Sequence, residues 1–107
     1  MSAIVVLCTT PSTEEATQLA HKLIENELCA CVTLRENLTS IFKWEGQICT
    51  EHECVLFIKT KASLFKEIEA FITEHHSYDV PEIIALPVTH GNASYLEWIE
   101  TNTKDKA

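Results

Sequence analysis

The side chains best suited to metal binding or proton transfer gather in a short stretch that begins with two adjacent imidazoles, His75 and His76. They close an apolar segment with helical spacing, and Asp79-Val80-Pro81 follows them. A residue before proline is disfavoured in the α region, so the helix must end there. Residues 83–88 then read as a buried strand, with Pro87 placing part of it at an edge or bulge. We predict that ligand-capable nitrogens lie where a helix meets the sheet.

Cysteines are the second group of side chains that could bind a metal. The chain has five cysteines, an odd number, and no C-x-x-C spacing, so neither a zinc ribbon nor a thioredoxin motif is present. We expect all five to be reduced. Two of them lie two residues apart on a predicted strand, which would place both on one side, where packing is favoured over a metal or redox pair. The cysteines are Cys8, Cys29, Cys31, Cys49 and Cys54.

Carboxylates are the third group of side chains with possible chemical roles. Asp79 and Glu82 flank Val80-Pro81 and could act as an acid/base pair. Turn and capping chemistry is the commoner use of such residues, and we favour it here. Trp44 and Trp98 could form a ligand cage, but core or interface packing is the default for tryptophan.

Bulk properties exclude several classes of protein. The 107 residues fit one domain, and the formal net charge of −8 argues against nucleic-acid binding, which depends on cationic neutralisation of phosphates. No apolar run approaches the roughly 20 residues of a membrane span, and residues 3–8 are too short for a signal-peptide core. We therefore expect a cytoplasmic protein without membrane contact.

Periodicity predicts strand, helix, strand, strand, helix, strand and a short final helix. This order indicates an α+β, ferredoxin-like (split βαβ) fold, an antiparallel sheet with two helices on one face. Ser12 and Glu15 form a capping-box pattern for the first helix, and Asn92 or Ser94 could cap the last. The tail from Thr101 is expected to fray. The predicted elements span residues 4–7, 12–26, 30–34 with 40–44, 48–59, 64–75, 83–88 and 95–99.

The predicted hairpin is too long for its domain. Residues 30–44 would extend roughly 50 Å at ~3.3 Å per residue, whereas a domain of this length is only about 35 Å across. The hairpin must bend, or overhang and find a partner. We expect Trp44, at its tip, to be buried by assembly rather than within its own subunit.

Several segments resemble the CutA divalent-cation tolerance family, nearly end to end and in order. They are Val5 to Thr10, Ala30-Cys31-Val32, Ser40 to Gly46, His76 to Pro87 and Tyr95 to Ile99. The Trp-Glu-Gly turn and Tyr-Asp-Val-Pro-Glu-Ile are the most specific. The resemblance implies a ferredoxin-like homotrimer held by its hairpins and sheet edges, tolerance of copper and other divalent metals, and no established enzymatic activity.

The resemblance also implies metal ligands. Family copper ligands are a cysteine ending the first strand and a His-His pair ending the second helix, which correspond to Cys8, His75 and His76. Here Ser77 stands where the family usually has proline. The predicted fold would allow Cys8 to approach the two histidines, because the first strand and the second helix end at the same edge of the domain. A thiolate with imidazoles suits copper or zinc. Alternatively, Cys8 is a core residue and the histidines are a solvated helix end, one facing away because adjacent helical residues point about 100° apart.

Three functions compete. The leading hypothesis is a non-enzymatic trimeric copper-binding protein that responds to divalent metal ions. The alternative is a trimeric assembly or signalling module that binds a small molecule or protein, with incidental metal binding. A hydrolase with Cys8 as nucleophile ranks last, because no nucleophile elbow, oxyanion loop or orienting acid is recognisable.

Overall fold

A computed structural model describes residues 2–105, and it confirms the predicted order of elements. Two of the helices start at a side-chain cap: the Ser12 hydroxyl caps α1 by accepting from the Glu15 amide at 3.1 Å, and the Asn92 side chain caps α3. Helix α2 has no side-chain cap and continues from the 3-10 turn before it. The elements are β1 (Ala3–Thr10), α1 (Thr13–Glu25), β2 (Cys31–Trp44), β3 (Gln47–Lys61), a 3-10 turn (Ala62–Leu64), α2 (Phe65–His75), β4 (Ile83–Pro87) and α3 (Ala93–Thr101).

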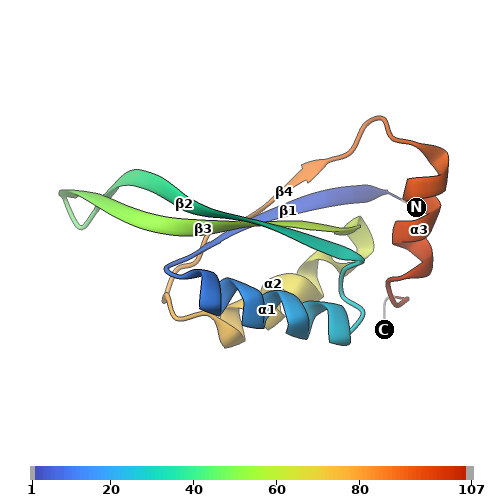
Figure 1. The fold of residues 1–107 in the computed structure, drawn as a ribbon, viewed down its shortest axis with the longest axis horizontal. Coiled ribbons are helices and arrows are strands. Elements are labelled where there is room, and N and C mark those ends of the chain that lie inside the picture. Colours follow the sequence, from blue (N-terminus) through green and yellow to red (C-terminus); the bar gives the residue numbers. More distant parts are fainter. Residues whose placement is uncertain (1, 106–107) are drawn as a thin grey trace.

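The four strands form one antiparallel sheet in the order β2-β3-β1-β4. Helices α1 and α2 cover one face of it, and α3 lies beyond its end, near the N-terminus (Figure 1). The ferredoxin-like prediction is confirmed. In this topology β1 and α2 finish at the same end of the molecule, where β4 begins beside β1.

The core lies between the sheet and the two helices. Alternate residues of the central strands point into it, among them Val6, Leu56 and Ile58, all without exposed surface. The helices contribute residues at helical spacing, such as Ile68 and Ile72. Each fully buried aliphatic side chain of this kind contributes about 1.5–3 kcal/mol to folding.

The β2–β3 hairpin extends past the rest of the sheet (Figure 1). Strand β1 pairs with β3 only over residues 54–61, so residues 38–53, which we call the arm, pair only with each other. A register shift between Arg35 and Leu38 marks its base, and Asn37 there has a φ of 60°. The hairpin therefore overhangs, and the longest molecular dimension is 44 Å.

Two sequence predictions are wrong in detail. Strand β4 was expected to be buried, yet Ile84 and Leu86 are half exposed, because β4 is an edge strand with an uncovered face. The tail was expected to fray, yet Thr103 is buried and the Lys104 amide donates to the Glu27 carbonyl at 2.9 Å.

A third correction concerns the neighbouring cysteines. Cys29 precedes β2 and is buried in the core, whereas Cys31 lies beside Lys59 on the open side of the sheet. They do not share a side, because the regular alternation of β2 begins only at Cys31.

Candidate metal site at the helix ends

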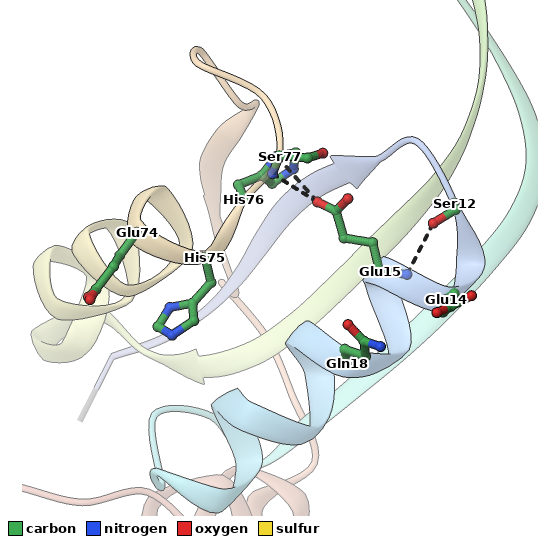
Figure 2. Close-up of a pocket in the computed structure, with 8 residues that line it drawn as sticks. All are labelled: Ser12, Glu14, Glu15, Gln18, Glu74, His75, His76 and Ser77. Atoms are coloured by element: carbon green, nitrogen blue, oxygen red, sulfur yellow. Dashed lines mark hydrogen bonds and ion pairs between the residues drawn. The ribbon is translucent and has the colours of Figure 1, made fainter.

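A polar cleft of about 480 Å³ lies between the first turn of α1 and the last turn of α2 (Figure 2). Carboxylates and one exposed imidazole give it its chemical character. Both predicted histidines contribute to its wall, whereas Cys8 does not. The lining residues are Ser12, Glu14, Glu15, Gln18, Glu74, His75, His76 and Ser77.

Glu15 connects the two helices across this cleft. Its carboxylate accepts from the Ser77 amide at 3.1 Å and lies 3.6 Å from Nδ1 of His76 (Figure 2). The predicted capping box is therefore only half formed, because the Glu15 side chain is directed to the end of α2.

His76 has a structural role, because its ring joins the end of α2 to β1 by hydrogen bonds. Its side chain has no exposed surface, and its Nε2 lies 2.7 Å from the Thr9 carbonyl of β1. Its Nδ1 accepts from the Tyr78 amide at 2.9 Å. A carbonyl can only accept, so Nε2 carries the proton and the ring is neutral. Both ring nitrogens are thus engaged, and neither offers a free lone pair to a metal.

His75 is arranged in the opposite way. It is exposed, its ring stacks on Phe71 at 4.2 Å between centroids, and its Nδ1 donates to the Phe71 carbonyl at 2.8 Å. In the neutral ring the lone pair is therefore on Nε2, for which residues 2–105 provide no hydrogen bond. A backbone carbonyl that fixes the tautomer in this way is typical of metal-binding histidines. In Figure 2 the two imidazoles leave the chain in different directions.

Cys8 is a core residue with no exposed surface. Burial raises the pKa of its thiol to about 12, helped by the negative charges of Glu82, Glu15 and Glu53. At neutral pH it is therefore a protonated thiol, whereas both metal binding and nucleophilic attack use the thiolate. This arrangement is the reverse of an activated nucleophile.

The three predicted ligands do not form a ready-made site. Within residues 2–105, no three histidine, cysteine or acidic side chains are close enough together to hold a metal ion. The fold does bring His76 to the end of the strand that carries Cys8, as its bond to Thr9 shows. His75 turns back along α2, so the expected divergence of adjacent helical residues is what separates the pair.

Sequence reasoning missed the residues that organise this end of the molecule, namely Glu15, Glu53 and Tyr78. The Tyr78 hydroxyl donates to Glu53 Oε2 at 3.0 Å, and Glu53 is buried on β3. Glu15 was noticed only as a cap, and Tyr78 only as part of a motif. Glu53 carried no signal at all, because one glutamate among alternating strand residues is unremarkable.

The other candidates are separated by the fold. Trp44 ends β2 at the arm tip, and Trp98 belongs to α3 at the opposite end of the molecule, so they do not form a cage (Figure 1). Trp98 instead stacks on Tyr95, with 5.6 Å between centroids. None of the helices in residues 2–105 is long and apolar enough to cross a membrane.

Comparisons with known proteins agree on one family. A family model described as CutA1 divalent ion tolerance protein matches residues 4–102. A divalent-cation tolerance protein CutA from Thermus thermophilus is 42% identical, over 92% of this chain and 96% of that protein. The chloroplastic protein CutA of Arabidopsis thaliana is 39% identical over 96% of this chain, which spans 57% of its length. The crystal structure of CutA1 from Oryza sativa superposes with a TM-score of 0.96, at 40% identity and over 98% of this chain and 96% of that one.

Proposed function

This chain belongs to the CutA1 divalent ion tolerance protein family, and from that membership we propose that it is a non-enzymatic, copper-binding homotrimer that contributes to tolerance of divalent cations. The observation that carries the proposal is His75. Its Nε2 lone pair is free, its tautomer is fixed by the Phe71 carbonyl, and it faces solvent beside a carboxylate-lined cleft. Copper and zinc are the ions that imidazole favours.

The proposed ligands are Cys8, His75 and His76, with zinc as a weaker competitor for the same ion site. Only His75 presents a lone pair as it stands. His76 would have to release the Tyr78 amide or the Thr9 carbonyl, and the Cys8 thiol would have to lose its proton. We therefore propose that His75 makes the first contact with the ion, and that the other two follow after a local rearrangement.

The homotrimer is proposed from the apolar surface that one chain leaves uncovered. Ile41 and Ile48 on the arm are 71% and 79% exposed, and Trp44 at its tip is half exposed. The register places Ile41 and Ile48 on one face of the arm and Trp44 on the other, so both faces carry exposed apolar side chains. Exposed apolar surface of this kind marks interaction sites. The two edge strands, β2 and β4, are different surfaces, so copies joined edge to edge would make a heterologous contact, which closes into a trimeric ring when each copy is rotated by a third of a turn.

Two features favour a binding role over catalysis and over a nucleic-acid partner. The Cys8 thiol is held protonated, which disfavours nucleophilic catalysis. The net charge of −8 disfavours nucleic acid. We propose no membrane partner and a cytoplasmic location. The cytoplasm would keep all five thiols reduced, and copper binding by Cys8 requires a reduced thiol.

Metal titration of the reduced protein tests the proposal. We expect copper to bind more tightly than zinc, and His75→Ala to weaken Cu²⁺ binding about tenfold or more, as for loss of one ligand. His21→Ala, which removes an exposed histidine of α1 away from the cleft, should leave binding unchanged. Equal copper affinity in these two variants would contradict the proposal. Retention of full affinity for Cu⁺ in Cys8→Ser would instead favour an assembly module with incidental metal binding.

A further inference from the structure

The segment between α2 and β4, residues 76–82, crosses the end of strand β1, and we call it the strap. It begins where α2 ends and leads to Ile83, which pairs with Cys8 in the sheet. Midway, the Tyr78 hydroxyl reaches Glu53 on β3, the strand on the other side of β1. The strap therefore spans from one neighbour of β1 to the other, over the end that carries Cys8.

Three polar contacts hold the strap down, each to a different element. His76 Nε2 donates to the Thr9 carbonyl of β1, the Ser77 amide donates to Glu15 of α1, and the Tyr78 hydroxyl donates to Glu53 of β3. The His76 and Tyr78 rings also lie 5.0 Å apart. The strap is buried unevenly: the His76 side chain has no exposed surface and Tyr78 is partly buried, whereas Ser77, Asp79 and Val80 are exposed.

The Cys8 thiol has no exposed surface, and its sulfur lies 3.8 Å from the Thr9 carbonyl oxygen, the same oxygen that His76 contacts. Two of the carboxylates that hold the strap, Glu15 and Glu53, are also among the charges that act on that thiol. The third, Glu82, belongs to the strap itself. Glu15 and Glu53 thus fasten the strap and also act electrostatically on the Cys8 thiol.

We propose that the strap is a gate over Cys8, and that Tyr78 and Glu53 are the positioning residues that keep it closed. Connecting segments that are partly exposed and held by a few hydrogen bonds open more often than the core does. Opening would expose the Cys8 sulfur and release His76 from Thr9 in one movement. The gate itself does not depend on metal binding, but its role in admitting copper rests on the proposed function.

Cysteine labelling in the full, reduced chain tests the gate. Iodoacetamide labelling, followed residue by residue with mass spectrometry, reports how often each thiol is exposed. Tyr78→Phe removes only the hydroxyl that Glu53 accepts, and we expect Cys8 labelling to accelerate roughly tenfold, as for loss of one hydrogen bond to a charged acceptor. Glu15→Gln should accelerate it less, because the amide oxygen can still accept from Ser77.

The chain provides its own controls. Cys29 is equally buried but lies at the far end of α1, so its labelling reports opening of the whole molecule. It should not change in Tyr78→Phe. Tyr95→Phe removes a hydroxyl from exposed α3 and should leave Cys8 labelling unchanged. Equal acceleration at Cys8 and Cys29, or no acceleration at Cys8 in Tyr78→Phe, would overturn the gate.

A measurement on the unmodified chain decides the matter should Tyr78→Phe fail to fold. Native-state hydrogen exchange should show the Ser77 and Tyr78 amides opening at least 100-fold more often than the Ile58 amide in the core. Comparable protection at all three would overturn the gate. Copper titration stays separate: accelerated Cys8 labelling without copper binding would leave the gate intact and refute only the proposed function.

Discussion

Strand β3 runs through two environments. Its second half, residues 54–61, pairs on both sides, and alternate residues such as Leu56 and Ile58 are fully buried under the helices. Its first half, in the arm, pairs only with β2, and Ile48 there is 79% exposed. The second half carries four consecutive apolar residues, Val55 to Ile58, whereas Ile48 and Cys49 stand among polar residues in the first half. The halves differ further in whether a second layer lies on the sheet.

The difference shows that a hairpin can be well defined in its backbone without having a core of its own. The turn at Glu45-Gly46, with φ of 50° and 79°, matches the type I′ geometry that fits the twist of paired strands, and the register is continuous from Leu38 to Trp44. Hydrogen bonds and the turn therefore shape the arm. Apolar burial stabilises the rest of the domain, outside residues 38–53, which we call the body. Within the described residues, Ile41 and Ile48 of the arm therefore gain little from apolar burial.

The largest expected effect lies in the body. Ile58→Ala should lower the free energy of unfolding by about 3 kcal/mol, because it leaves a cavity in a fully buried position. Urea unfolding measures this at several protein concentrations. Ile48→Ala serves as the matched arm variant, and its cost should vanish on dilution. An Ile48→Ala cost that persists at all concentrations would break the distinction between body and arm.

At the arm tip, Trp44→Ala should weaken subunit association by on the order of 2 kcal/mol, typical of an aromatic interface anchor. Light scattering over a dilution series would show dissociation at higher concentration than for the unmodified chain. Trp98→Ala, which removes the other tryptophan, from α3, is the control for losing a large side chain. A trimer of unchanged stability in Trp44→Ala, or a folded monomer at low micromolar concentration without any substitution, would contradict the prediction.

Two adjacent residues repeat the contrast within the body. His76→Ala should cost about 1.5 kcal/mol of unfolding free energy, because it leaves the Thr9 carbonyl and the Tyr78 amide without their partner. His75→Ala should cost less than about 0.5 kcal/mol, as for an exposed position. Thermal unfolding of both variants measures the difference. Equal costs would show that the buried, hydrogen-bonded His76 contributes no more to stability than the exposed His75.

The smallest effect is a pH dependence confined to the body. Burial raises the pKa of both Cys8 and Cys29 from 9.0 to about 12, so the folded state favours the protonated thiols. Stability from this source is complete below pH 9 and is lost as pH rises from 9 towards 12. Urea midpoints between pH 8 and 10 should fall, and less steeply in Cys8→Ala. An identical slope in Cys8→Ala would show that this thiol does not contribute.

The candidate site has some features that the sequence predicts and others that it does not. That His75 and His76 end a helix, and that this helix ends beside β1, followed from local patterns and from the split βαβ order. That one ring would turn away from the other was foreseen as an alternative, because adjacent helical positions diverge. Which ring ties the chain and which stays free could not be foreseen, since it depends on the Thr9 carbonyl, 67 residues away.

By itself, the sequence determined the order of elements, the cap at Ser12, the length of the hairpin and the family, because each depends on short-range periodicity or on motifs in one stretch of chain. For the last helix it left the cap open between Asn92 and Ser94, and the structure selects Asn92. Only the tertiary structure decided that Glu15 binds the end of α2, that Tyr78 donates to a buried Glu53, and that β4 leaves one face uncovered. These contacts join residues 25 to 62 positions apart. A side chain's partner across such a separation is selected by the packing of whole elements, which no local pattern encodes.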